Sequence, residues 1–269
     1  MAFTNSFTMA GICSAFPAIE DEAMLQRLLL AGMLSGFVVA VFAFSFARVV
    51  SEPSIERAIS LEEGAAHGHG DSHDETYSRD VQRNAGLFTG IVSYSVALGG
   101  FLAIGLAYAH GRTPVRTRAT VWLLAGAGYV SLVLVPQLIY PASPPGVGSA
   151  ETIGVRTGLY FLVMLASVAG MGASTWVAYR FSLLLPTSVA ITAGAAVFAG
   201  LSWVCASQFP EVSEVPKYFP RGLLLEFRIN AAMLQLLIWG GLAVAYGQVA
   251  EFVLARIQTG VPPRGVPNA

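Results

Sequence analysis

Three histidines and two aspartates fall within eight consecutive residues, a spacing at which one short segment could bind a metal ion. His67, His69 and His73 offer imidazole nitrogens, and Asp71 and Asp74 offer carboxylates. Imidazole suits Zn²⁺, Cu²⁺, Ni²⁺, Co²⁺ and Fe²⁺, and carboxylates can complete the ligand set. Because a flexible segment loses entropy on closing, the pattern favours weak, exchangeable capture over a rigid cage. The alternative is a solvated linker in which histidine is incidental.

A second group of polar side chains lies within long apolar segments. Gln137, Asn230 and Gln235 are the members of interest. Polar groups at membrane depth usually face other helices or a wet cavity. These residues therefore indicate either hydrogen bonds between helices or a hydrated ion path.

Four prolines in residues 135–148 predict irregular backbone, because proline lacks a donor and disfavours helix. We expect Tyr140–Gly148 to fold back and meet Phe219–Arg228. Tyr140, Glu226 and Arg228 would then share one interface containing a partly desolvated pair between arginine and carboxylate. This interface is the candidate outer vestibule; simple anchoring of the helix at the membrane surface is the alternative.

The elements that position these residues are six apolar blocks without a charged side chain, each of at least 20 residues. A helix needs about 20 residues to cross the hydrocarbon core, and a chain in lipid must satisfy its own backbone hydrogen bonds. The predicted fold is an all-α, polytopic transmembrane bundle of about six spans. The blocks are Leu28–Ala47, Ala85–Ala109, Ala119–Tyr140, Thr157–Tyr179, Phe181–Ala206 and Ile229–Ala250, with a tight hairpin expected between the fourth and fifth.

Composition agrees with a membrane protein and excludes several functions. The chain is 55% hydrophobic, only 12% charged, and has a net charge of −1, so nucleic acid is not an expected partner. The apolar blocks contain no histidine for a b-type haem. Neither a zinc-protease motif nor a phosphate-binding loop occurs. We expect no enzyme and no permanently bound cofactor.

Basic residues set the expected orientation. Arg112, Arg116 and Arg118 cluster after the second block, whereas the loop after the third block holds only Arg156. The positive-inside rule then places both termini in the cytoplasm. The expected regions are a cytoplasmic segment 1–27, a six-span domain 28–254 with a histidine-containing outer loop 48–84, and a tail 255–269. Within that loop we expect helix near Pro53–Leu61 and irregular structure over Glu62–Thr76.

Several of these segments carry a family resemblance. Glu52-Pro53, Tyr140-Pro141-Ala142-Ser143-Pro144-Pro145-Gly146-Val147-Gly148, and Phe227-Arg228 with Gln235 and Trp239 resemble the CbtA family of cobalt transporter subunits, most closely its actinobacterial branch. The resemblance extends over about Leu25–Arg256. It implies cobalt uptake for cobalamin synthesis across a prokaryotic cytoplasmic membrane. It also implies a small partner, CbtB, with one membrane helix and a histidine-rich end. The family is usually described with five spans, against six blocks here.

Two functions remain open from the sequence. The first is a membrane subunit for uptake of a divalent ion, with Co²⁺ or a similar ion as its cargo. The second is a non-transporting accessory or scaffold subunit of a larger membrane complex. Glycine pairs inside the blocks and the lack of charge at membrane depth fit the second.

Overall fold

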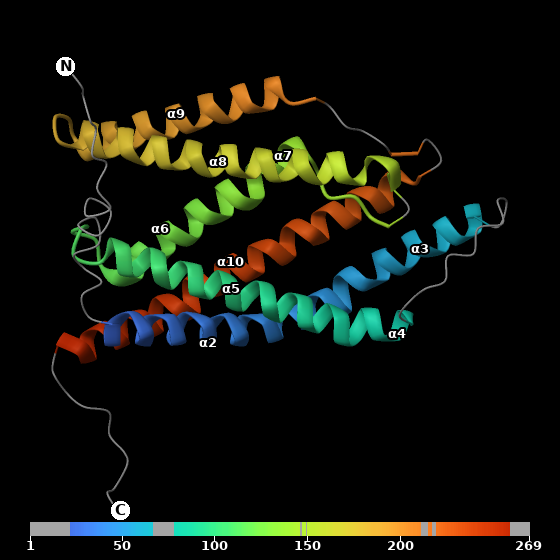
Figure 1. Cartoon of the computed structure of the whole chain (residues 1–269), viewed down its shortest axis with the longest axis horizontal. Helices are drawn as coiled ribbons and strands as arrows, with labels where there is room; N and C mark the ends of the chain where they lie inside the picture. Colours follow the sequence, from blue (N-terminus) through green and yellow to red (C-terminus); the bar gives the residue numbers. More distant parts are fainter. Residues whose placement is uncertain are drawn as a thin grey trace, which may run out of the picture. The chain divides into compact units, whose positions relative to one another are not determined.

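A computed structural model describes residues 22–66, 78–145, 147–148, 150–210, 215–216 and 219–258, and all regular structure in these residues is helical (Figure 1). Six of the described helical runs are long and apolar enough to cross a membrane, which confirms the predicted all-α fold. The elements are α2 (Glu22–Phe46), η2 (Ala47–Ser51), α3 (Glu52–Ala66), α4 (Arg79–Val81), η3 (Gln82–Gly86), α5 (Leu87–Ala109), α6 (Thr117–Tyr129), η4 (Val130–Leu134), α7 (Val135–Ile139), η5 (Ala150–Thr152), α8 (Ile153–Ser182), α9 (Thr187–Gln208) and α10 (Arg221–Gln258).

Large apolar side chains cover the outside of these helices. Leu30, Phe42 and Trp203 expose 61%, 66% and 73% of their surface. Such exposure would be unfavourable in water but is neutral against lipid tails, which are as apolar as leucine. The chain is a multi-pass membrane protein.

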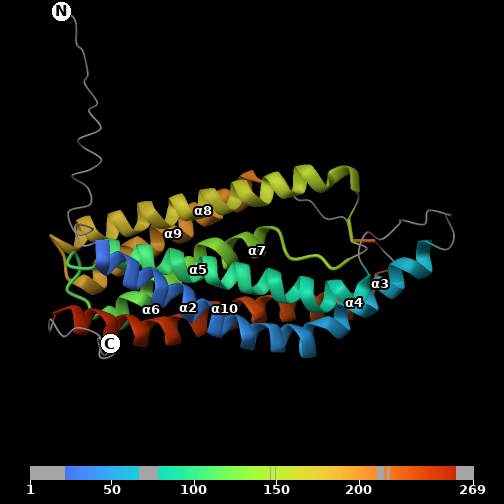
Figure 2. The same cartoon turned by 60° about the horizontal axis from the view of Figure 1, so that its bottom comes forward.

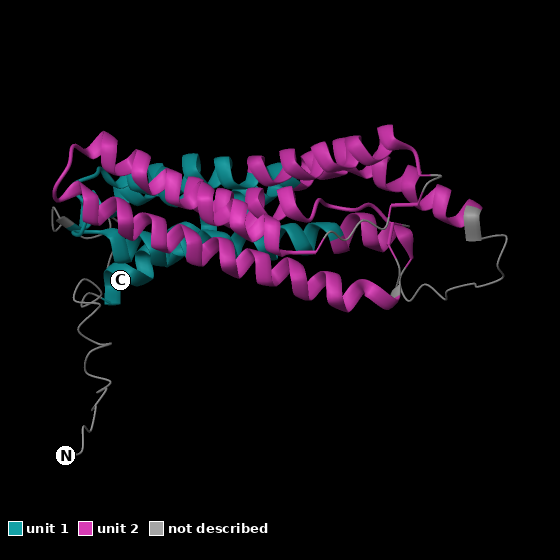
Figure 3. Cartoon of the chain, turned by 90° about the horizontal axis from the view of Figure 1, so that it is seen from above, with its two compact units in different colours: residues 1–43, 87–125, 238–269 teal, residues 44–86, 126–237 magenta. Residues whose placement is uncertain are grey.

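The chain divides into two compact units (Figure 3): residues 1–43, 87–125 and 238–269 form unit 1, and residues 44–86 and 126–237 form unit 2. In unit 1, α2 and α5 approach each other at glycines. A Cβ on Gly32 or Gly99 would collide with the carbonyl oxygen of the other, and a Cβ on Gly36 would collide with that of Ser95. These three glycines therefore allow the two helices to pack closely, whereas a Cβ on Gly90 would have no neighbour within 4 Å.

In unit 2, α8 and α9 form the predicted helical hairpin and lie side by side in Figures 1 and 2. A Cβ on Gly194 would lie 2.8 Å from Cβ of Ala178, so the two helices pack closely. The predicted start of the fifth span at Phe181 was wrong. Pro186, with φ −53° and ψ 140°, is the N-cap of α9, and the helix begins at Thr187.

Two turns of π-helix in unit 2 precede prolines. The carbonyl four residues before Pro53 belongs to η2, and the carbonyl four residues before Pro136 belongs to η4. A proline ring clashes with that carbonyl in a regular α-helix, and a wider turn relieves the clash. Helix therefore continues through Val135–Ile139, so the expectation that irregular backbone begins at Val135 was wrong; it begins at Tyr140.

The loop between the first two spans contains more helix than expected. Helix was predicted near Pro53–Leu61, and α3 covers it but continues through Glu62 to Ala66. The segment Glu62–Thr76 was expected to be irregular, but its first residues, Glu62 to Ala66, are helical. Residues 67–77 lie outside the described residues.

Candidate functional site

The proline-rich segment meets the beginning of α10, as the sequence predicts. Nε of Arg228 donates a hydrogen bond of 3.2 Å to the carbonyl oxygen of Ala142. Val147 belongs to one buried apolar cluster with Phe219, Leu223 and Ala58. This hydrogen bond and the small apolar cluster therefore hold the segment against α10 and α3.

Tyr140 connects the same segment to the end of α9. Its hydroxyl donates a hydrogen bond of 2.9 Å to the carbonyl oxygen of Pro210. A tyrosine phenol ordinarily has a pKa of about 10, so it is neutral at physiological pH and available as a donor.

The expected pair between Glu226 and Arg228 is not formed. Glu226 instead forms an ion pair with Arg57 of α3. Residues two apart on a helix point to different sides, because only positions three or four apart are neighbours. Arg228 accordingly faces the proline-rich segment, while Glu226 faces α3.

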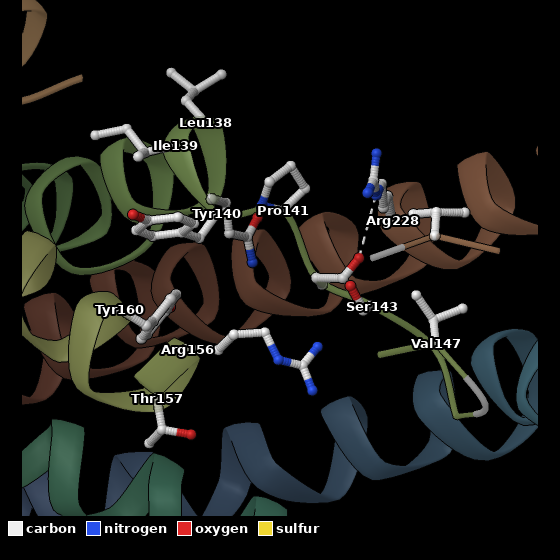
Figure 4. A pocket seen from close by; sticks show the side chains of 13 residues that line it. Leu138, Ile139, Tyr140, Pro141, Ser143, Val147, Arg156, Thr157, Tyr160 and Arg228 are labelled. Carbon is white, nitrogen blue, oxygen red and sulfur yellow. Dashed lines mark hydrogen bonds between the residues drawn. The ribbon is translucent and has the colours of Figure 1, made fainter. Parts of the chain in front are cut away.

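A cavity of about 620 Å³ lies beside this junction (Figure 4). Among the described residues that line it, the charged side chains are those of Arg156 and Arg228, and none is a carboxylate. Both guanidinium groups are cationic and offer no lone pair, so Arg156 and Arg228 do not serve as ligands of a metal dication. The lining residues are Gln137, Leu138, Ile139, Tyr140, Pro141, Ala142, Ser143, Val147, Arg156, Thr157, Tyr160, Val215 and Arg228.

The remaining candidates are distributed elsewhere. Asn230 donates a hydrogen bond of 3.3 Å from Nδ2 to the carbonyl oxygen of Val50 in η2, and Gln235 is partly exposed one turn further along α10. Neither they nor Glu226 line the cavity that Gln137, Tyr140 and Arg228 share. The histidine segment, with His67, His69, His73, Asp71 and Asp74, lies outside the described residues. Within the described part of the chain, no three His, Cys, Asp or Glu side chains are grouped to hold a metal ion.

Comparison with known proteins identifies the family. Residues 25–251 match the family described as "Probable cobalt transporter subunit (CbtA)". The chain belongs to the CbtA family. Neither the curated proteins nor the solved structures contain a match to it. The match overlaps all six of the described apolar helical runs of this CbtA chain and agrees with its function as a membrane subunit for metal uptake.

Sequence reasoning missed a set of ion pairs around α3 of this CbtA protein. Glu52 forms an ion pair with Arg79, and its side chain is only 3% exposed. Arg83 binds Glu56 at 3.0 Å and Asp80 at 2.5 Å. The spacing could have predicted these pairs. Glu52 and Glu56 are four residues apart, as are Arg79 and Arg83, so each set lies on one face of a helix. Glu52-Pro53 carried the family resemblance, yet no role was assigned to its carboxylate.

Proposed function

We propose that this chain is the multi-pass subunit of a prokaryotic uptake system for a divalent metal ion, with Co²⁺ as the favoured cargo. The observation that carries the proposal is the family match over residues 25–251. The chain catalyses no reaction in this proposal and holds no permanent cofactor, since the metal ion is cargo. Its location is the cytoplasmic membrane, with both termini in the cytoplasm and residues 48–84 outside.

The histidine segment is the proposed capture site. Ala66 ends α3, and the described chain resumes at Ser78, directly before Arg79. Arg79 pairs with Glu52, the first residue of α3, so the described chain resumes beside the beginning of this helix. Weak imidazole and carboxylate ligands in residues 67–77 would raise the local metal concentration next to the bundle.

An accessory role is the second candidate, and one observation favours it. The described helices present no group of three metal-binding side chains of the His, Cys, Asp or Glu type. A single-span, histidine-rich partner of the CbtB kind, which the family resemblance suggests, would supply the missing ligands. In that arrangement CbtA provides the framework and the two chains together provide the path.

The test is uptake of ⁵⁷Co by cells lacking other cobalt systems, expressing the chain with and without such a partner. Uptake that requires this chain supports the proposal, and uptake by the partner alone assigns the chain an accessory role. Replacing His67, His69 and His73 together with alanine should lower uptake at scarce metal and have less effect at abundant metal. Unchanged uptake at every concentration would leave the segment as a linker.

A further inference from the structure

Glu52 is the one buried carboxylate among the acidic residues that the structure describes. Its residue is 2% exposed, whereas every other described Asp or Glu is exposed or partly exposed. Burying a carboxylate is costly unless a positive charge compensates it. Here the compensating charge is the guanidinium of Arg79.

The two partners of this ion pair differ in their access to solvent. The Glu52 side chain is 3% exposed, but that of Arg79 is 30% exposed. Arginine has a long side chain whose charged end can turn towards water while its stem stays packed. The carboxylate is therefore buried inside the protein, while the side chain of its cationic partner keeps some contact with solvent.

Two other buried polar side chains are associated with this turn of the helix, Ser51 directly before Glu52 and Asn230, which bonds to the backbone of Val50. Ser51 is 9% exposed, and its buried Oγ has no hydrogen-bond partner. Asn230 is also 9% exposed. Its Nδ2 donates a hydrogen bond to the carbonyl oxygen of Val50, two residues before Glu52, and its Oδ1 is the atom of the amide that could bind a cation. An unsatisfied buried hydroxyl costs free energy, and a bound cation would satisfy it.

The local backbone supports the same interpretation. The π-helical turn η2 ends at Ser51, directly before Glu52. Such turns occur frequently at functional sites, because they break the regular pattern of helix carbonyls.

We propose that Glu52, Ser51 and the amide oxygen of Asn230 form a binding site for the transported divalent cation, at which the cation replaces Arg79 as the partner of the carboxylate. A carboxylate with hydroxyl and amide oxygens is a ligand set for a hard or borderline dication. The double charge gives the cation an electrostatic advantage over one guanidinium. This inference rests on the proposed uptake function.

The test measures Co²⁺ binding to the purified full-length chain in detergent, by equilibrium binding of ⁵⁷Co. All variants carry alanine at the three loop histidines, so that the loop contributes no binding. Glu52→Gln should weaken binding at least about 10-fold, since even outer-shell changes at metal sites alter affinity by 10–100-fold. Arg79→Gln removes the positive charge that competes with the cation for Glu52, so it should strengthen Co²⁺ binding. Arg79→Lys keeps a positive charge, so its Co²⁺ affinity should lie between those of Arg79→Gln and the parent chain.

A metal site predicts opposite changes in Co²⁺ affinity for Glu52→Gln and Arg79→Gln, whereas a purely structural ion pair does not. Arg83→Gln is the matched control, because its partner Glu56 is 47% exposed; it should leave binding unchanged. Equal losses in Glu52→Gln and in both Arg79 variants would overturn the site and leave the pair as a structural link. Absence of Co²⁺ binding in the histidine-free parent would overturn it as well.

Uptake in cells distinguishes this inference from the proposed function. If the parent chain with its partner takes up ⁵⁷Co and Glu52→Gln does so equally well, the site is wrong while the function stands. If the parent chain supports no uptake, the proposed function is wrong, and the detergent measurements alone decide whether Glu52 binds metal.

Discussion

Substitution of Gly99 by alanine tests the close approach of α5 to α2 in unit 1. A Cβ at Gly99 would collide with the carbonyl oxygen of Gly32 and lie 2.7 Å from its carbonyl carbon. These are backbone atoms, so no side-chain rotation relieves the contact and the helices must separate. Overpacking of this kind costs about 1–3 kcal/mol. We expect Gly99→Ala to lower the free energy of unfolding by that amount.

Gly90, on the same helix, is the matched control. No atom lies within 4 Å of a Cβ placed there. Alanine at this position removes the entropic penalty of a helical glycine, which is worth about 0.5–1 kcal/mol. The two substitutions are chemically identical but should shift stability in opposite directions, by a difference of about 1.5–4 kcal/mol.

The measurement is reversible unfolding in mixed micelles, with the denaturing detergent increased at constant lipid. Gly32→Ala should reproduce the effect of Gly99→Ala. The double variant should cost less than the sum, because helices already separated by one Cβ accommodate the second. If Gly99→Ala and Gly90→Ala were equally stable, the inferred contact between backbones would be wrong.

Three further outcomes are expected. A double-mutant cycle of Arg57→Gln and Glu226→Gln should give a coupling energy below about 1 kcal/mol, because both side chains are exposed, by 54% and 40%; a larger coupling would contradict the exposed geometry. Tyr140→Phe should destabilise the chain by about 0.5–1.5 kcal/mol through loss of the bond to the Pro210 carbonyl, and an unchanged midpoint would show that water replaces this bond. In a background without the two native cysteines, an impermeant thiol reagent should label a cysteine at Ser72, but not one at Thr113, in intact cells; the reverse pattern would invert the topology.

The spans could be predicted because lipid imposes one simple requirement on composition over about 20 residues. Their ends could not be placed as well, since they depend on single prolines. Pro186 moved the start of α9 to Thr187, whereas Pro136, in the first turn of α7, was tolerated within helix. Composition contains no information on which of these outcomes a given proline produces.

Pairing in the candidate site was predictable only in part. The meeting of Tyr140–Gly148 with Phe219–Arg228 followed from a stiff, proline-rich segment that had to cover the end of the bundle. The partner of Glu226 did not follow, because Arg57 lies 169 residues away in sequence and α3 had no predicted place against α10. Long-range ion pairs depend on the packing of whole helices, and local spacing does not determine that packing.

The charges in unit 2 also bear on why a metal-uptake subunit would need a second chain. Among the described residues, one carboxylate is buried, and buried hydroxyls such as Ser131 and Ser174 already donate to backbone carbonyls at 2.7 Å. Even a single charge at the bilayer centre costs about 2.5–3.5 kcal/mol on insertion scales, and a dication requires more compensation. In the proposed site, one carboxylate and a few neutral oxygens would receive the divalent ion. Passage across the membrane needs more compensation than these described groups give, and for that reason we expect an adjoining chain to contribute further ligands.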